Sequence, residues 1–407
     1  MKKRLVVIGN GMAGMRTVEE LLAATPDKYE ITVFGAEPYG NYNRIMLSSV
    51  LCGEKTIEDI VINNRQWYVD NGIILHAGEH KTVSRIDRKN RKVYAQDGTV
   101  AAYDRLLIAT GSKAVIPSIP GNDLDGVISF RDIFDVNKML SYCQSHNKAV
   151  VLGGGLLGLE AANGLVLRGM DVTVIHNNEV LLNRQMDRPA GKMLQTELEQ
   201  RGLKFKMAAK TQQLLSDDNG HVTAVRFEDG SQLECDLFIM AIGVRPNMAL
   251  AQEAGIYCER GIVVSDTLQS YDPSVYAVGE CIQHRGDTFG LVAPLFEQAK
   301  VCANHLGAHG AAEYVTLPTA TKLKVTGINL FSVGDFQGDE SCESIHFTDP
   351  AIGIYKKLVI KADKLIGAVL YGDTTDGNWY QELLEKEAPI SGIRDVMIFG
   401  KAYLAST

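Results

Sequence analysis

The sequence has no closely spaced pair of cysteines. Its seven cysteines lie far apart along the chain, and no Cys-x-x-Cys occurs among them. This spacing argues against a small disulfide-bonded scaffold and against a zinc or iron–sulfur site made by this chain alone. Isolated cysteines among apolar neighbours usually act as small core residues. We therefore expect reduced thiols, as in a cytoplasmic protein.

Long apolar runs and an excess of positive charge are also missing. No run reaches the roughly 18 residues that a membrane-crossing helix needs. The apolar run after the basic start, residues 5–8, is too short for the core of a signal peptide. Lys and Arg number 41 against 49 Asp and Glu, whereas nucleic-acid binders usually carry a basic field. We therefore expect a cytoplasmic protein that binds neither nucleic acid nor membrane.

The length and composition are those of a folded chain with several cores. At roughly 100–200 residues per domain, 407 residues predict about two to four domains. Hydrophobic residues make up 45% and charged residues 22%, which are ordinary values for globular proteins and exclude extended disorder.

The strongest local signal is a glycine-rich turn near the start. Residues 4–8 predict a buried parallel strand, and residues 15–24 predict a helix. The turn between them, residues 9–14, reads Gly-x-Gly-x-x-Gly, in which the glycines permit a tight turn, close approach to a pyrophosphate and close helix–strand packing. A second strand, residues 29–34, leads to Glu37, placed where an acid accepts hydrogen bonds from a ribose. This pattern predicts a dinucleotide site.

The same pattern occurs a second time. Residues 149–152 predict a strand, residues 153–158 repeat the glycine pattern, and residues 159–168 predict a helix followed by a strand at 171–175. Two such fingerprints predict two dinucleotide sites on one chain. An enzyme that binds two dinucleotides typically moves electrons between them, from a nicotinamide to a flavin.

The second fingerprint departs from the usual pattern at its acidic position, where the chain has His176. This side chain could hydrogen-bond a ribose hydroxyl, or its cation could face a 2′-phosphate. No arginine cluster follows directly, and Arg184 is the nearest arginine that follows. Because a 2′-phosphate normally needs such a cluster, NADH is favoured over NADPH, with NADPH left open. The alternative for His176 is a surface histidine at a strand end.

Three further segments, residues 103–112, 238–247 and 274–281, read as strands that run into small-residue or Gly-acid turns. With both glycine turns in this order, the chain resembles the flavoprotein reductases of the pyridine nucleotide–disulfide oxidoreductase superfamily over roughly residues 1–310. Residues 42–49, 153–162 and 290–294 look closest to the N-terminal part of NAD(P)H nitrite reductase large subunits. Rubredoxin and ferredoxin reductases look similar but less close.

The resemblance implies a fold. It implies an α/β protein with two Rossmann-like, doubly wound domains of the glutathione-reductase type and a C-terminal α+β interface domain. The FAD-binding domain would comprise residues 1–112 and 248–312, and the NAD(P)H-binding domain residues 113–247. Residues 313–407 would form the interface domain. Independently of the resemblance, the alternating pattern of residues 322–336 and 355–370 predicts antiparallel strands, with a hairpin turn at 362–364.

The resemblance also implies the residues that hold FAD. Glu37 would hold the adenosine ribose, Val83 would contact the adenine, and Glu280 would bond the ribitol chain. The other residues expected around FAD are Gly9, Gly11, Met12, Ala13, Gly14, Arg44, Ser48, Ala109, Thr110, Gly111, Arg131, Gly279, Pro294, Leu295 and Phe296. The last three would begin a helix whose N–H groups face the flavin. Arg44 could instead be a surface cation, and Arg131 could pair with a neighbouring aspartate.

On the nicotinamide side, the resemblance implies a second set of residues. They are Gly153, Gly155, Leu156, Leu157, Gly158, His176, Ala241, Ile242 and Gly243. Glu160 would lie between nicotinamide and flavin and, with Arg44, is the candidate catalytic residue. The alternative for Glu160 is a helix cap or a partner of a lysine. No metal-binding residues are expected.

The missing cysteine pair bears on the chemistry. Disulfide reductases of this superfamily place two close cysteines beside the flavin to take its electrons. Here Cys52 has no near partner, and Cys281 is expected to be packed in the core. Electrons would therefore leave for an external centre, and a lone reactive cysteine of the peroxidase type is the less favoured alternative.

These expectations lead to one main hypothesis and two alternatives. The chain would pass electrons from NADH through FAD to an iron–sulfur or sirohaem acceptor in nitrite reduction or nitrate assimilation. That acceptor would lie on another chain or in a missing downstream domain, and a homodimer is open. The alternatives are a rubredoxin or ferredoxin reductase, and a flavoprotein that binds NADH and senses redox state.

Overall fold

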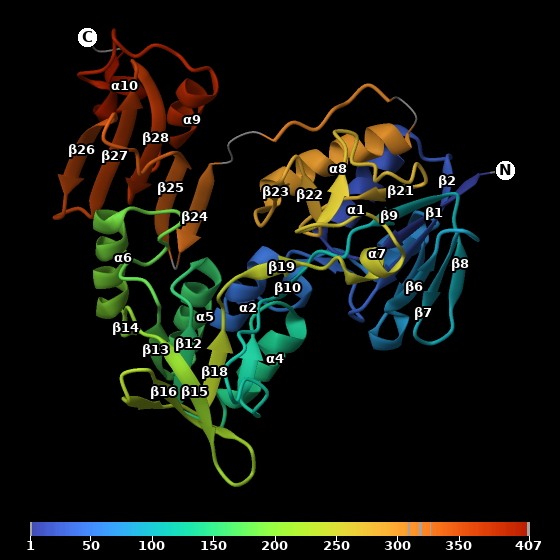
Figure 1. Cartoon of the computed structure of the whole chain (residues 1–407), viewed down its shortest axis with the longest axis horizontal. Helices are drawn as coiled ribbons and strands as arrows, with labels where there is room; N and C mark the ends of the chain where they lie inside the picture. The colour runs from blue at the N-terminus through green and yellow to red at the C-terminus, as the bar shows by residue number, and fades with distance from the viewer. Residues whose placement is uncertain (1, 308–309, 317–319, 326, 405–407) are drawn as a thin grey trace. The chain divides into compact units, whose positions relative to one another are not determined.

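The computed structural model describes residues 2–307, 310–316, 320–325 and 327–404. The chain divides into two compact units (Figure 1). The first unit contains Met1–Leu47, Lys55–Ala114 and Val244–Thr316, and the second contains Ser48–Glu54, Val115–Gly243 and Leu317–Thr407. The boundaries expected for three domains stay a prediction.

The first unit is built on a five-stranded parallel sheet with the order β21-β9-β1-β2-β5. Its strands are β1 (Lys3–Ile8), β2 (Tyr29–Gly35), β5 (Ile74–Ala77), β9 (Arg105–Ile108) and β21 (Val275–Ala277). Helices α1 (Met12–Ala24) and α8 (Val292–Leu306) pack against each other beside this sheet. The short apolar strands form here because both faces of a parallel sheet are covered.

Smaller elements complete the first unit. They are β3 (Asn41–Tyr42), η1 (Arg44–Met46), η2 (Glu58–Ile60), β4 (Val61–Asn63), α3 (Arg65–Asp70), η3 (Glu79–Lys81), β6 (Val83–Asp87), β7 (Lys92–Ala95), β8 (Val100–Ala102), β10 (Ser112–Ala114), β19 (Val244–Pro246), α7 (Ala249–Glu253), β20 (Ile262–Val264), β22 (Ile282–His284) and β23 (Asp287–Thr288). Strands β10 and β19 pair as an antiparallel ribbon.

The second unit contains another five-stranded parallel sheet, with the order β11-β18-β12-β13-β14. Its strands are β11 (Val127–Ser129), β12 (Lys148–Leu152), β13 (Asp171–Ile175), β14 (Lys204–Lys206) and β18 (Leu237–Met240). The helices of this part are α2 (Leu47–Cys52), α4 (Ile133–Tyr142), α5 (Leu156–Leu167) and α6 (Arg188–Gln200). A separate small sheet contains β15 (Thr211–Ser216), β16 (Val222–Phe227) and β17 (Gln232–Glu234).

The C-terminal part of the second unit is an antiparallel sheet with the order β24-β25-β28-β27-β26. Its elements are β24 (Thr321–Val325), β25 (Ile328–Gly334), β26 (Glu343–Asp349), β27 (Ile354–Lys361), β28 (Lys364–Tyr371), α9 (Gly377–Glu385), η4 (Met397–Phe399) and α10 (Lys401–Leu404). The predicted hairpin turn is confirmed, because Ala362 and Asp363 both have positive φ and join β27 to β28. Helix α9 covers β25 and β28.

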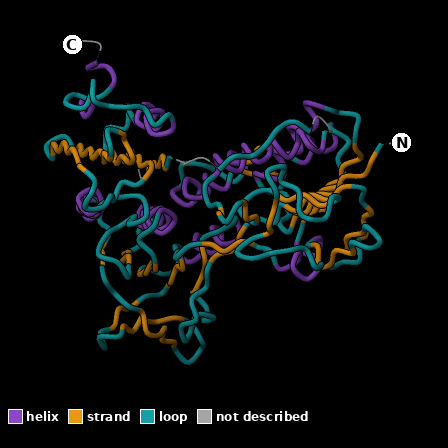
Figure 2. The backbone as a smooth tube through the Cα atoms, turned by 45° about the horizontal axis from the view of Figure 1, so that its top comes forward, coloured by secondary structure: helices purple, strands orange, loops and turns teal. Residues whose placement is uncertain are grey.

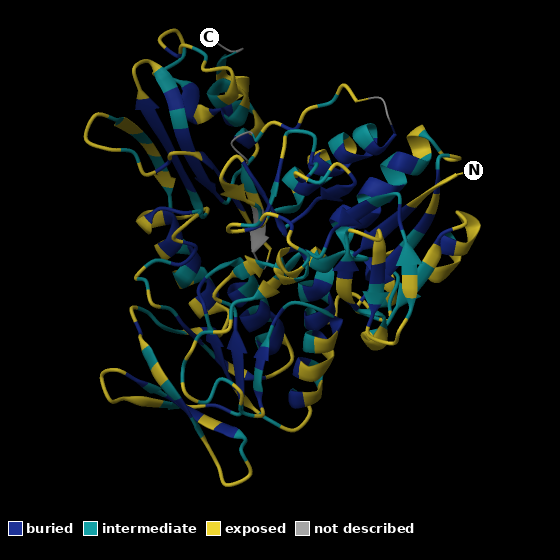
Figure 3. Ribbon diagram, turned by 45° about the vertical axis from the view of Figure 1, so that its right-hand side comes forward, coloured by how far each residue is buried: buried dark blue, intermediate teal, exposed yellow. Residues whose placement is uncertain are grey.

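Both parallel sheets repeat one strand–turn–helix arrangement, in which strands alternate with helices (Figure 2). The strands carry the buried residues, and exposed residues gather on loops and outer helix faces (Figure 3). Helices α1 and α5 begin three residues earlier than predicted, at Met12 and Leu156. The glycine before each helix, Gly11 or Gly155, is its N-cap with extended backbone, so the helix starts directly after it.

Within the second unit, a buried hydrogen bond joins the C-terminal sheet to α6. Asp187 caps the start of α6 by accepting from the Ala190 N–H at 3.3 Å. The Tyr355 hydroxyl on β27 donates to the same carboxylate at 2.6 Å, and the Lys357 ammonium lies 3.9 Å from it. Burial and this carboxylate raise the pKa of Tyr355. One side chain therefore serves both as a helix cap and as an acceptor for the neighbouring sheet.

We predict that Tyr355→Phe lowers the free energy of unfolding by about 1–3 kcal/mol, because it leaves a buried carboxylate without a hydroxyl donor. Tyr371→Phe is the matched control. Tyr371 is the cross-strand partner of Tyr355, is equally buried, and has no hydrogen bond recorded from its hydroxyl within the described residues. Urea denaturation monitored by circular dichroism measures both variants. Equal losses in the two variants would contradict this role of Tyr355.

Candidate nucleotide-binding sites

The first glycine turn is shaped by its contact with the end of β9. Gly9 has a φ of +115°, and a Cβ there would lie 2.1 Å from the carbonyl oxygen of Ala109. At Gly14, in the first turn of α1, a Cβ would lie 2.8 Å from the Ala109 Cβ. By contrast, a Cβ on Gly11 would meet no described atom within 4 Å. Two glycines therefore allow close packing, and the middle one lines an open space at the N-terminus of α1.

The second turn has the same geometry. Gly153 has a φ of +127°, and its Cβ would lie 2.3 Å from the carbonyl oxygen of Ala241 at the end of β18. A Cβ on Gly158 would lie 2.0 Å from the Gly153 carbonyl oxygen, whereas one on Gly155 would meet nothing within 4 Å. Each turn thus leaves an open cradle at a helix N-terminus, where N–H groups and the helix dipole favour a phosphate. Both cradles fit the pyrophosphate of a dinucleotide.

A polar side chain that the sequence analysis did not single out supports the first turn. The Oδ1 atom of Asn10 accepts from the Tyr68 hydroxyl at 2.6 Å, and its backbone oxygen accepts from the Asn41 side-chain amide at 3.1 Å. Asn10 occupies a variable position of the glycine pattern, and its partners come from distant segments. The sequence therefore held no signal for these contacts.

The acid expected to hold a ribose is tied to the arginine expected near the flavin. The Arg44 guanidinium pairs with Glu37, and the Tyr42 hydroxyl donates to the same carboxylate at 2.7 Å. The guanidinium carbon of Arg44 also lies 4.9 Å from the centre of the Tyr42 ring. The structure thus pairs Glu37, which was expected at the adenosine ribose, with Arg44, which was expected near the flavin. Arg44 is held in the unit rather than extended as an isolated surface cation.

The segments after β9 and β21 meet in the first unit. The Ser112 hydroxyl donates to Glu280 at 2.8 Å, and the Thr110 hydroxyl donates to the Asn247 carbonyl at 2.6 Å. The N–H of Gly279 donates to the side-chain oxygen of Gln298 at 2.8 Å. Gln298 is fully buried on α8 and was missed by the sequence analysis. Its contact with Gly279 joins segments that are brought together only by folding, so the sequence held no direct signal for it.

Other residues expected around FAD lie on ordinary elements of the first unit. Val83 is buried and begins β6. Helix α8 begins at Val292, two residues before the start expected at Pro294, so the proline lies inside its first turn. Leu295 is buried. The guanidinium carbon of Arg16 lies 5.7 Å from the centre of the Phe296 ring. Met12 and Ala13 open α1, and Gly111 has the positive φ of a tight turn.

Glu160 and Ser48 come together in the second unit. Helix α2 packs on α5: the Arg168 guanidinium donates to the Leu51 carbonyl at 2.7 Å, and Leu51 lies against Gly164. Ser48 hydrogen-bonds the Glu160 carboxyl, which lowers its pKa, but burial outweighs this effect and raises the pKa to about 7. No lysine contributes to this shift, so the alternative of a lysine partner has no support. A carboxyl with this pKa can hold or release a proton at neutral pH.

Arg131 and its neighbours also lie in the second unit. The backbone N–H of Arg131 donates to Asp135 at 2.7 Å, and Asp132 caps α4. Burial and the Asp132 charge raise the pKa of Asp135 to about 6. The expected contact of Arg131 with a flavin stays a prediction.

His176 follows β13 and bonds to the second glycine turn. Its Nδ1 atom accepts from the Gly154 N–H at 3.2 Å, and burial lowers its pKa. A ring nitrogen that accepts a hydrogen bond carries no proton, so the ring is neutral and its Nε2 atom is the donor. Hydrogen bonds of the ring with the Asn183 side chain and the Val180 backbone act against the effect of burial on its pKa. A neutral ring is not a cation suited to a phosphate.

The remaining residues expected on the nicotinamide side surround the same turn. Leu156 and Leu157 are the first residues of α5, and the Ala241 N–H donates to the Leu152 carbonyl at 2.9 Å. Ile242 is 42% exposed, an unusual position for a large apolar side chain. Gly243 has a φ of +120°, and its carbonyl accepts from the Val115 N–H.

The two cysteines considered as reactive candidates, Cys52 and Cys281, have raised pKa values. All seven cysteines of the chain are free. Burial raises the pKa of Cys52, and it raises the pKa of Cys281 to about 11. A reactive cysteine needs a lowered pKa, so the peroxidase-type alternative loses support. Within the described residues, no helix is long and apolar enough to cross a membrane.

Comparison with known sequences identifies the class. Residues 3–305 match the pyridine nucleotide-disulphide oxidoreductase family, and residues 319–388 match the C-terminal domain of rubredoxin NAD⁺ reductase. The chain belongs to this family of FAD- and NAD(P)H-dependent oxidoreductases. The resemblance and the fold class expected from the sequence are confirmed.

Individual relatives narrow the comparison. The chain is 47% identical over 98% of its length to a nitrite reductase [NAD(P)H] of Bacillus subtilis, and 45% identical over 96% to the assimilatory nitrate reductase electron transfer subunit of that organism. It spans only 49% and 50% of these two proteins. The solved structure of NADH:rubredoxin oxidoreductase from Clostridium acetobutylicum is 26% identical, with a TM-score of 0.81 and 100% of both chains covered.

We predict that Gly11→Val and Gly155→Val each remove one nucleotide and leave the other. Their side chains would fill an open cradle without touching the fold, since neither Cβ meets a described atom. Gly11→Val should be purified colourless, and Gly155→Val should remain yellow but fail to bind NADH. Absorbance of the bound flavin and fluorescence titration with NADH measure the two losses.

Two controls accompany this pair. Gly392→Val adds a side chain at another open position and should retain both nucleotides. Gly9→Ala, which collides with a backbone carbonyl, should lower the melting temperature instead. Normal FAD retention by Gly11→Val would show that the first cradle is assigned wrongly.

We also predict that Glu160→Gln stabilises the protein at pH 8 relative to the wild type. The folded carboxyl keeps its proton up to pH about 7, whereas its ordinary value is 4.5. The native state therefore binds more protons in this window, and wild-type stability falls as the pH rises through it. The gain should reach at most about 3 kcal/mol at pH 8 and be largely absent at pH 4.5.

Denaturation at the two pH values measures this difference. Glu253→Gln, at an exposed position, is the charge-matched control. A gain of the same size at both pH values would mean that ionisation of Glu160 is not its cause.

Proposed function

We propose that this chain binds FAD and NADH and passes electrons from NADH through FAD to an iron–sulfur or sirohaem acceptor, in nitrite reduction or nitrate assimilation. The observation that carries the proposal is the match of nearly the whole chain to one half of a nitrite reductase at 47% identity. The acceptor would then lie on another chain or in a further segment. A cytoplasmic location and a homodimer belong to the same proposal.

The two open cradles support the proposed division of work. Residues around Gly11, with Glu37 and Glu280, would hold FAD, and residues around Gly155 would hold NADH. When bound, FAD can accept a hydride and release electrons one at a time. The chain's own part is to orient both groups, and Glu160 would hold or release a proton beside them.

The state of the cysteines supports an external acceptor. No two cysteines are bonded, and the thiols of Cys52 and Cys281 have raised pKa values. Thiol exchange depends on a thiolate, so a dithiol beside the flavin has no candidate among these side chains. Electrons would leave the chain for a separate centre.

The neutral ring of His176 supports NADH as the donor. A 2′-phosphate needs a cation, which this ring does not supply because its Nδ1 atom accepts a hydrogen bond and burial lowers its pKa. We therefore expect kcat/KM for NADH to exceed that for NADPH.

A rubredoxin reductase is the second candidate. It is favoured by the match of residues 319–388 to the C-terminal domain of such enzymes and by the structure of the clostridial enzyme, which the chain covers over its full length. Its acceptor would be a small diffusible protein.

Steady-state kinetics with the FAD-loaded chain tests the proposal. NADH should reduce ferricyanide rapidly, and the chain alone should not reduce nitrite. Gly155→Val, which retains FAD, is the control for the NADH site. Addition of an iron–sulfur and sirohaem nitrite reductase module should restore NADH-dependent nitrite reduction, whereas rubredoxin should be reduced poorly. Efficient rubredoxin reduction would favour the second candidate, and negligible NADH oxidation with any acceptor would contradict both.

A further inference from the structure

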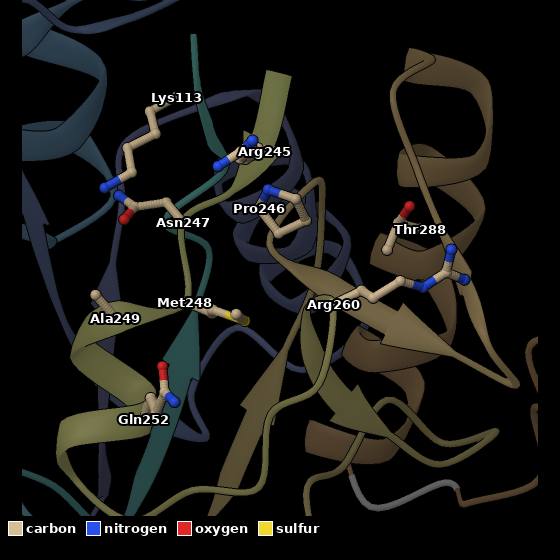
Figure 4. A pocket seen from close by; sticks show the side chains of 9 residues that line it. All are labelled: Lys113, Arg245, Pro246, Asn247, Met248, Ala249, Gln252, Arg260 and Thr288. Carbon is tan, nitrogen blue, oxygen red and sulfur yellow. The ribbon is translucent and has the colours of Figure 1, made fainter. Parts of the chain in front are cut away.

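The first unit contains a pocket of about 500 Å³ that takes no part in either glycine turn (Figure 4). It is lined by Lys113, Arg245, Pro246, Asn247, Met248, Ala249, Gln252, Arg260 and Thr288. These residues come from the β10–β19 ribbon, from α7, from the segment before β20 and from β23. The volume lies within the range of about 300–1,000 Å³ that is usual for small-molecule sites.

The charges around this pocket are all positive. Lys113 and Arg245 are direct cross-strand partners in the β10–β19 ribbon, whereas Arg260 comes from another segment and its guanidinium points away from Lys113 (Figure 4). No carboxylate lines the pocket, and among the described residues neither Lys113 nor Arg245 has a side-chain hydrogen bond or ion pair. Like charges directly opposite each other destabilise a strand pair. An anion bound between the two cations would offset their mutual repulsion.

The pocket faces away from the candidate FAD site. Ser112 directs its hydroxyl to Glu280, which is one of the residues expected around FAD. Successive side chains of a strand point to opposite faces, so Lys113 lies on the other face of the ribbon from this contact. Arg245 shares that face because it is the register partner of Lys113. Lys113 and Arg245 are therefore separate from the groups proposed to hold FAD.

The other lining residues indicate what kind of anion fits. Asn247, Gln252 and Thr288 add neutral donors around the cations, and Pro246 and Met248 add apolar surface. The Arg260 guanidinium is turned to the Gly286 carbonyl, to which it donates. We propose that this pocket binds a phosphorylated small molecule, with its phosphate between Lys113 and Arg245 and its organic part against Pro246 and Met248.

A ligand bound to the β10–β19 ribbon would contact both strands that connect the two units. The chain leaves the first unit directly after β10, at Ala114, and returns to it at the start of β19, at Val244. A phosphate that bridges Lys113 and Arg245 would therefore hold together the two strands through which the chain leaves and re-enters the unit.

Calorimetric titration of the FAD-loaded protein with pyrophosphate and with AMP tests the site. The wild type should bind both, and Lys113→Gln/Arg245→Gln should weaken both by about tenfold or more, because two charged partners of the phosphate are lost. Lys89→Gln/Lys92→Gln removes the same charge from exposed positions of the same unit and should bind like the wild type. Both double variants should retain FAD.

Thermal denaturation provides a second measure. Without ligand, the melting temperature of Lys113→Gln should exceed that of the wild type, because the cross-strand repulsion is gone. Pyrophosphate should raise the wild-type value more than that of the variant. The proposal is overturned if the wild type binds neither probe or if both double variants bind equally. It is also overturned if citrate, a carboxylate anion, binds as tightly as the phosphates.

Discussion

The contact of one glycine with the carbonyl of a neighbouring strand determines where each candidate nucleotide site forms. Gly9 touches the Ala109 carbonyl in the first unit, and Gly153 touches the Ala241 carbonyl in the second. Only a glycine with positive φ allows the turn to approach the next strand this closely. The following helix then begins at once, with its free N–H groups beside the space over Gly11 or Gly155. The open cradle depends on the tight contact next to it.

The three glutamates expected at the nucleotide sites differ in their hydrogen-bond and ion-pair partners. Glu37 is held by Arg44 and Tyr42, Glu280 by Ser112, and Glu160 by Ser48. For Glu160, burial raises the pKa to about 7, and the hydrogen bond from Ser48 offsets only part of this effect. The residue proposed to hold a proton is thus a buried carboxyl whose pKa lies near neutral pH.

Much of the fold could be predicted from the sequence because its signals are local. The glycine spacing, the β-branched strands and the hairpin at Ala362 and Asp363 follow from short-range stereochemistry. The contacts of Asn10, Gln298 and Asp187 could not be predicted, because each joins segments that only the folded sheets bring together. The packing of α2 on α5 was missed for the same reason. For His176, the sequence left its charge open, and its hydrogen bond to Gly154 favours the neutral ring.

The placement of α2 limits how this protein can be divided. Its residues follow Arg44 in the chain, yet they belong to the second unit, where Leu51 covers Gly164 and Ser48 covers Glu160. A fragment that began after Ala114 would uncover both. The apolar surface of α5 would be exposed to water, and the Glu160 carboxyl would return toward the acidity of an ordinary glutamate. Neither unit can therefore be obtained whole by cutting the gene at a single point, and a recombinant half without α2 would keep Glu160 but lose the burial that raises its pKa.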